Sequence, residues 1–149
     1  MSQRVIAIAL FCFSTSALAL SPTAQDNRIA IVITPNERNQ LLYEMRESLH
    51  TLFNMHNALA KQDMKAVAVA TRPMAGLLER LPENVKSQFP AEFTQMAIGM
   101  QEALQVIARD AETKGDMSLT HSQMAEVMTY CSGCHDTYRV EVKPPKTRR

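Results

Sequence analysis

The chain has no tryptophan, only four glycines and only three cysteines among its 149 residues. Scarce glycine together with abundant Ala, Leu, Glu and Gln favours helices over sheets. Lysine plus arginine nearly balances aspartate plus glutamate, 16 against 15, so the formal net charge is +1. This balance gives no indication of a nucleic-acid partner, which a strongly basic surface would attract. The composition therefore predicts an all-α protein, and after removal of a leader its length of about 125 residues suits one domain.

Residues 1–19 have the features of a secretory signal peptide. A single early Arg4 precedes an apolar stretch, and small residues lead to an Ala-Leu-Ala cleavage pattern that ends at Ala19. We expect cleavage after Ala19, with Ala24 as the alternative, and Cys12 is then discarded with the peptide. The apolar stretch is too short for a spanning helix, although an uncleaved anchor is the competing interpretation. The mature protein is expected in the periplasm, without a membrane segment.

The segment Cys131-Ser132-Gly133-Cys134-His135 has the Cys-x-x-Cys-His spacing of covalent haem attachment. On a helix, residues at i, i+3 and i+4 share one face, so both thiols and the imidazole would point at the same partner. The thiols would bond to the two vinyl groups of a porphyrin, and His135 would be the proximal ligand of the iron. Export agrees with this chemistry, because thiols are handled outside the reducing cytosol. The motif predicts one covalent haem c.

Three other interpretations of the motif stay open. A structural zinc site needs four ligands, and the remaining histidines have no short paired spacing with further cysteines. These are His50, His56 and His121. A thioredoxin-like redox pair follows a strand, whereas this motif is expected near the end of the last helix. A plain disulfide or a chance match is the third alternative.

Four helices without an internal repeat are expected. The first begins at Thr34, because Thr34 and Glu37 form a capping-box pattern around Pro35. Pro73 should kink the second helix near Arg72. The first two expected helices span residues 34–61 and 64–81. An irregular connection at 82–90 leads into the third, which Gly115 ends, and the fourth spans about 119–140. Short links between them imply antiparallel neighbours.

Apolar residues spaced by three and four mark the core-facing stripes of the first and third helices. The first stripe is Leu42, Met45, Leu49, Leu52, His56 and Leu59, and the second is Phe93, Met96, Met100, Leu104, Ile107 and Ala111. The apolar run Ile29–Ile33 has no evident strand partner, so residues 20–33 are interpreted as an extended arm on the bundle or on a second subunit. Residues 34–141 form the helical domain. Residues 142–149 form a basic tail, interpreted as solvated or as a docking patch for an acidic redox partner.

Near the carboxyl end, Cys-Ser-Gly-Cys-His-Asp-Thr-Tyr-Arg follows the four expected helices and resembles the class II c-type cytochromes, the cytochrome c′ family. The resemblance covers roughly residues 34–140. It implies an antiparallel four-helix bundle with one covalent haem on Cys131, Cys134 and His135. It also implies that a residue of the first helix covers the other face of the iron, a methionine in six-coordinate members and a bulky non-ligating residue in five-coordinate members. Homodimers are common in the family.

Met45 is the candidate for this distal position. In an antiparallel bundle residues 41–46 lie at the level of His135, and Met45 is the only thioether among them. Core filling by Met45 and an iron covered by Leu42 are the alternatives, with Met96 and Met100 as further candidate ligands. Supporting roles fall to Arg38, Arg46 and Arg139 at the haem propionates, to Tyr138 at the porphyrin edge, and to His56 as a core or partly exposed histidine.

Two functions follow. A six-coordinate iron held by His135 and Met45 predicts a periplasmic electron carrier that meets redox partner proteins. An open distal site predicts binding of a small gas such as nitric oxide or carbon monoxide. An enzyme such as a peroxidase needs a distal acid-base group, and Leu41, Leu42 and Met45 offer none, so no enzymatic activity is expected. Coordination number, redox potential, partner identity and oligomeric state are left open by the sequence.

Overall fold

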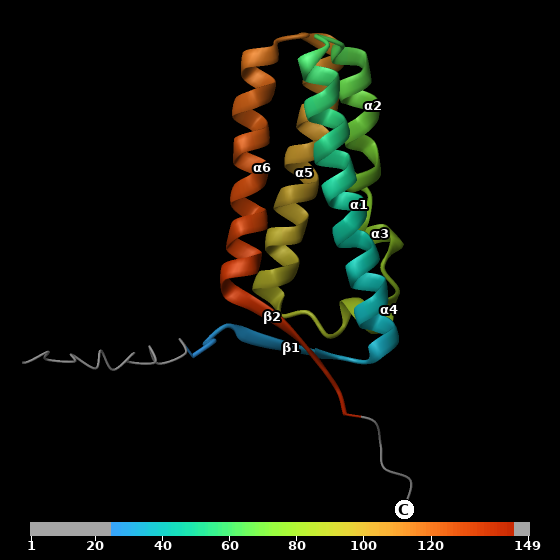
Figure 1. Cartoon of the computed structure of the whole chain (residues 1–149), viewed down its shortest axis with the longest axis vertical. Coiled ribbons are helices and arrows are strands. Elements are labelled where there is room, and N and C mark those ends of the chain that lie inside the picture. The colour runs from blue at the N-terminus through green and yellow to red at the C-terminus, as the bar shows by residue number, and fades with distance from the viewer. Residues whose placement is uncertain (1–24, 145–149) are drawn as a thin grey trace, which may run out of the picture.

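A computed structural model describes residues 25–144, so the predicted cleavage sites after Ala19 and Ala24 and residues 145–149 of the tail lie outside the described residues. Most of the described residues are helical. The helices are α1 (Pro35–Ala60), α2 (Met64–Ala75), α3 (Leu77–Arg80), α4 (Glu83–Lys86), α5 (Ala91–Thr113) and α6 (Met117–Thr137), and the strands are β1 (Ile29–Ile33) and β2 (Tyr138–Val142). Figure 1 shows the four longer helices side by side, with the two strands across one end. Within residues 25–144, no helix is both long and apolar enough to cross a bilayer.

The start of α1 confirms the predicted capping box. The backbone N–H of Glu37 donates to the Thr34 hydroxyl at 3.3 Å, and the N–H of Thr34 donates to Glu37 Oε2 at 2.7 Å. Glu37 also accepts a hydrogen bond of 2.7 Å from the Asn84 side chain. These bonds lower the pKa of the Glu37 carboxyl, the Thr34 backbone N–H contributing most. The capping box therefore fixes where the chain turns from β1 into α1, and Glu37 ties this corner to α4.

The predicted second helix is divided in two. α2 continues past Pro73 and ends at Ala75, and after Gly76 the chain forms α3. Pro73 therefore lies inside α2, and the break falls at Gly76 rather than near Arg72. Arg80 stabilises the interrupted turn by donating to the Pro73 carbonyl at 2.5 Å. The connection expected to be irregular contains α4.

The end of the fourth helix and the arm both need correction. α6 begins at Met117 behind the Asp116 cap and ends at Thr137, not at Val140. Residues after it form β2, which pairs in parallel with β1 so that Ile31 lies opposite Val140. The run Ile29–Ile33 is therefore extended as predicted, but it is a paired strand and not a lone arm. The all-α prediction thus holds for the helices and misses this two-stranded sheet.

The buried face of α1 also differs from the predicted stripe. Leu49 is 66% exposed, Leu42 is 37% exposed, and His56 is exposed. The helix instead buries polar as well as apolar side chains, among them Leu41, Glu44, Ser48, Thr51 and Met55. Glu44 is tolerated inside because Arg80 lies 2.7 Å from its carboxylate, and Ser48 because its hydroxyl donates to the Glu44 carbonyl at 2.8 Å. The prediction was wrong for Leu42, Leu49 and His56, whereas Met45 and Leu52 are half-buried and Leu59 is buried.

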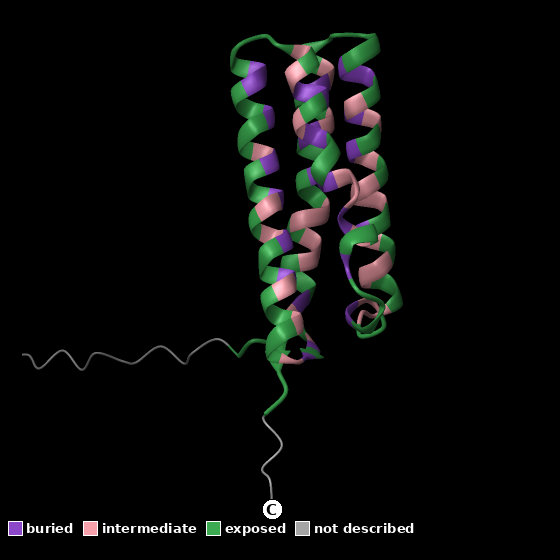
Figure 2. Cartoon of the chain, turned by 90° about the vertical axis from the view of Figure 1, so that its right-hand side faces the viewer, coloured by how far each residue is buried: buried purple, intermediate pink, exposed green. Residues whose placement is uncertain are grey.

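The core follows the helix interfaces. The main interfaces join α1 to α2, α2 to α5 and α5 to α6. Figure 2 shows buried residues scattered along the helices among exposed ones. The largest cluster includes Met55, Leu59, Val67, Leu104, Ile107 and Val127, which confirms the second half of the predicted α5 stripe. Two smaller clusters involve the strands and the α3–α4 segment, respectively, and Met45 packs against both.

Candidate functional site

A cavity of about 380 Å³ lies between α1, α5, α6 and the α3 segment. Its volume falls in the range of small-molecule and cofactor sites. Most of its lining is aliphatic, aromatic or thioether, including Ile31, Leu41, Leu77, Leu81, Phe89 and Ala97. A large flat apolar group such as a porphyrin is the kind of ligand that these walls suit.

The haem-attachment motif forms one wall of this cavity. Cys131, Cys134 and His135 lie on α6 and all line the cavity, as their i, i+3 and i+4 spacing predicts. Both cysteines are half-buried, whereas His135 is exposed. Gly133 lies between them, and a side-chain carbon there would come within 3.5 Å of Met96 Sδ on α5. The structure thus brings the two thiols and the imidazole of the motif together at an apolar pocket.

The thiols do not have the properties of a redox pair. Burial raises the pKa of both Cys131 and Cys134, and their place near the carboxyl end of a helix gives no electrostatic help to a thiolate. Catalytic thiols of the thioredoxin type have lowered pKa values instead. In the described residues the two cysteines form no disulfide, and no group of three or more His, Cys, Asp or Glu side chains is placed to hold a metal ion.

Met45 and Leu42 line the same cavity from α1. Met45 is half-buried. Three further thioethers line the cavity: Met96 and Met100 of α5, and Met74 of α2, which is 2% exposed. Sequence reasoning missed Met74, although its place directly after Pro73 marked the point where the second helix was expected to bend. The cavity is therefore rich in the soft side chains that iron accepts as axial ligands.

Tyr138, predicted to pack on the porphyrin edge, is buried and lines the cavity. Its ring makes an edge-on contact with Phe93 at a centroid distance of 5.3 Å. Desolvation raises the pKa of its hydroxyl. The candidate propionate ligands differ: Arg139 is among the lining residues, whereas Arg38 and Arg46 are exposed on α1 and are not among them.

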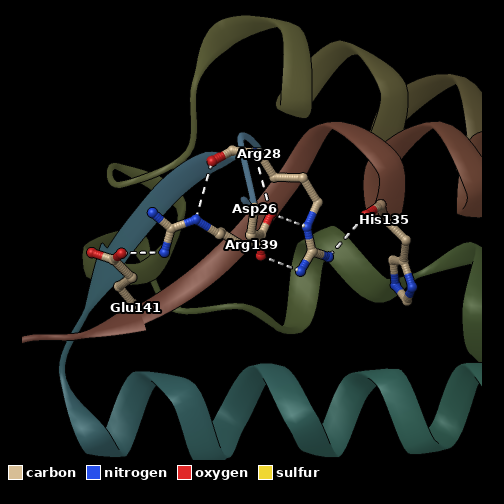
Figure 3. Close-up of polar contacts among 5 residues, drawn as sticks. All are labelled: Asp26, Arg28, His135, Arg139 and Glu141. Carbon is tan, nitrogen blue, oxygen red and sulfur yellow. Dashed lines mark hydrogen bonds and ion pairs between the residues drawn. The ribbon is translucent and has the colours of Figure 1, made fainter. Parts of the chain in front are cut away.

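Sequence reasoning also missed Arg28, which lines the cavity beside Arg139. Figure 3 shows its guanidinium between Asp26 and the backbone of His135. Nη1 donates to the His135 carbonyl at 3.0 Å, and Nε and Nη2 donate to the Asp26 carboxylate at 2.9 and 2.8 Å. The Arg139 Nε donates to the Arg28 carbonyl at 3.1 Å, and Arg139 also pairs with Glu141. No local sequence pattern could reveal the contact of Arg28 with the His135 carbonyl, because the two residues lie 107 positions apart in the sequence.

Cys131, Cys134 and His135, in the spacing of a haem-attachment motif, thus line one apolar cavity of a mostly helical chain. Residues 87–139 match the family model described as Cytochrome C′. The match covers about a third of the chain and supports the resemblance to a cytochrome c′-type class II cytochrome noted from the motif. No curated protein and no solved structure matches the chain. This partial family match suggests a haem c protein, either an electron carrier or a gas binder.

Acid is expected to weaken the polar cluster around Arg28. The hydrogen bonds from Arg28 lower the pKa of Asp26 from 3.8 to about 2. A carboxyl group whose pKa is lower in the folded than in the unfolded state stabilises the fold fully at a pH above its unfolded-state pKa. This stabilisation is lost as the pH falls toward the folded-state pKa of about 2. Thermal unfolding followed by circular dichroism between pH 5 and about pH 2 should therefore show a falling melting temperature. Asp26→Asn should flatten part of this slope, and an unchanged slope in that variant would contradict the assignment.

Proposed function

We propose that the chain is a periplasmic electron carrier with one covalent haem c, folded as an antiparallel four-helix bundle. The observation that carries the proposal is that Met45 of the first long helix and His135 of the last line one apolar cavity, together with Cys131 and Cys134. A histidine and a thioether are an axial pair found in electron-carrying cytochromes.

The chain's residues have distinct tasks in this proposal. Cys131 and Cys134 would tether the haem, which when bound supplies an iron that changes reversibly by one electron. His135 would hold the iron from α6, and the Met45 thioether would favour the ferrous state and raise the potential. The apolar walls exclude water, so little solvent has to reorganise when the charge changes. Phe93 and Tyr138 pack into the same walls.

The cavity wall contributed by α1 argues against an enzyme. Its residues are Leu41, Leu42, Met45 and Ser48. Peroxidase-type chemistry needs an acid-base side chain within hydrogen-bond reach of the reacting oxygen. The Ser48 hydroxyl donates to the Glu44 carbonyl at 2.8 Å, and a serine hydroxyl is a poor acid or base at neutral pH. We propose electron transfer without substrate turnover.

Redox partner proteins would approach the end of the molecule where the strands lie. His135 is exposed there, and Ile29, Val140 and Val142 are exposed apolar side chains of the two strands. A small apolar surface near a redox centre lets a partner approach closely and leave again, as transient complexes require. The exposed edge of the site is thus the proposed place of electron exchange.

An absorption spectrum of the haem-loaded protein, oxidised and reduced, with and without carbon monoxide, tests the proposal. A low-spin spectrum with the weak charge-transfer band of methionine on ferric iron, unchanged by carbon monoxide, is expected for the carrier. A high-spin spectrum that shifts with carbon monoxide would instead support gas binding. The observation that favours this second function is Leu42, which lines the cavity beside Met45 and could cover a five-coordinate iron.

A further inference from the structure

The helix that carries the Cys-x-x-Cys-His motif, α6, ends at Thr137, two residues after His135. The N–H of Tyr138 still donates to the Cys134 carbonyl. The His135 carbonyl would next accept from residue 139, but that residue belongs to β2, which pairs with β1. Carbonyls at the end of a helix need another donor. Arg28 provides it, with Nη1 at 3.0 Å from the His135 oxygen (Figure 3).

Arg28 is held in place from several sides. Asp26 binds two of its guanidinium nitrogens, at 2.8 and 2.9 Å. The Arg28 carbonyl accepts from Arg139, the residue that follows Tyr138 in β2. The strand pairing begins next to it, with Ile29 opposite Tyr138. Because its other partners already hold the planar guanidinium, Arg28 loses little further freedom when it binds the His135 carbonyl. The contact therefore fixes the position of that carbonyl relative to β1.

The contact also joins the two walls of the cavity. β1 runs through Thr34 directly into α1, which carries Met45, whereas β2 follows directly on α6, which carries His135. The main helix interfaces pair α1 with α2 and α5 with α6. The strand pair lies across one end of the helices (Figure 1), and together with the Arg28 contact it links α1 and α6 next to the residues of both helices that line the cavity.

We propose that Arg28 is a positioning residue for His135: by binding the His135 carbonyl, it fixes the end of α6, and with it the imidazole, against the strand that leads into α1. The inference rests on the proposed role of His135 as the proximal ligand. Arg28 itself does not touch the iron in this proposal. It acts through the backbone that carries the ligand.

The test compares Arg28→Gln and Arg28→Lys in the haem-loaded protein by resonance Raman spectroscopy of the iron–histidine stretch after photolysis of carbon monoxide. All variants carry Met45→Ala, so that carbon monoxide can bind. Lysine keeps the charge but lacks the fork that reaches Asp26 and the carbonyl together. Both variants are expected to shift and broaden the stretching band, because the imidazole loses its fixed orientation. Arg72→Gln, which removes an exposed arginine paired with Glu112 away from the cavity, should leave the band unchanged.

Three outcomes would overturn the proposal. An unchanged stretching band in both Arg28 variants would show that the contact does not position His135. A change in reduction potential in Arg28→Gln alone, with Arg28→Lys like the parent and the band unmoved in both, would mean that only the charge of Arg28 matters. Haem missing from the parent protein itself would contradict the proposed function. Failure of the proposed function is thus distinguished from failure of the proposed role of Arg28. Melting temperatures of the same variants show whether a shifted band reflects general unfolding. A band that shifts only in proportion to the loss of stability would count against a role of Arg28 in positioning His135.

Discussion

The chain with Cys131→Ala and Cys134→Ala is expected to carry no haem after denaturation and solvent extraction, whereas the unaltered chain keeps its haem. The two thioether bonds would be the only covalent links between protein and porphyrin. His135 and the apolar walls can bind haem only reversibly, and unfolding removes both. Coexpression with a haem-attachment system, followed by acid extraction and intact-mass measurement, gives the result directly. The single variants should each retain one thioether bond and lose haem only in part.

Ser132→Ala is the matched control, because Ser132 stands inside the motif but is exposed, and its hydroxyl only donates to the Met128 carbonyl at 2.9 Å. This variant should keep its haem. Alanine at the two cysteine positions costs little volume, so loss of haem there cannot be ascribed to collapse of the fold. Porphyrin that is extracted freely from the unaltered chain would contradict covalent attachment. Haem that remains in the double variant would contradict the assignment to these two thiols.

The elements that the sequence predicted correctly are those set by local chemistry. Thr34 and Glu37 cap α1 through partners three residues apart, and Gly115 follows α5 with a φ of 63°, a conformation that glycine adopts without strain. The strand pair escaped prediction because neither strand is stable alone and each meets its partner only after more than a hundred residues of chain. Its pairing depends on the completed arrangement of the helices.

The orientation of α1 could not be read from hydrophobic spacing for a related reason. Glu44 counts as polar in any such pattern, yet it is 1% exposed because Arg80 of α3 supplies its partner. Once Glu44 and Ser48 face inward, Leu49 must face outward. A buried ion pair between distant residues thus turns the buried face toward Glu44 and Ser48, and only Met45, Leu52 and Leu59 of the expected stripe stay at least half-buried.

The candidate site also contains residues that local sequence spacing predicts and residues that only the folded chain brings together. The spacing of Cys131, Cys134 and His135 defines a shared helical face without knowledge of the fold, and the structure places all three at one cavity. Arg28 and Met74 join them only through tertiary packing. Arg46 is a candidate from sequence because a guanidinium pairs well with a carboxylate, but it is exposed on α1 and does not line the cavity that the neighbouring Met45 lines.

Met45→Leu is expected to convert a low-spin, carbon monoxide-insensitive iron into a high-spin iron that binds carbon monoxide. Leucine has nearly the volume of methionine and is usually tolerated in its place at a cost below about 1.5 kcal/mol. The packing of Met45 against the two smaller clusters would therefore persist, while the thioether that we propose as ligand would be gone. Absorption spectra of the ferric and ferrous protein, with and without carbon monoxide, measure the change. The reduction potential should fall, because a thioether stabilises ferrous iron.

Matched methionines separate ligation from packing. Met55→Leu alters a fully buried core methionine that does not line the cavity, so its spectrum should stay low-spin. Met74→Leu, Met96→Leu and Met100→Leu test the other thioethers at the cavity, and none of them should change the spin state if Met45 is the ligand. A high-spin conversion in one of these three, with Met45→Leu unchanged, would move the distal ligand to α2 or α5. A parent protein that is already high-spin would leave Met45 as packing and make gas binding the function, because an iron that lacks a sixth protein ligand has a free coordination position.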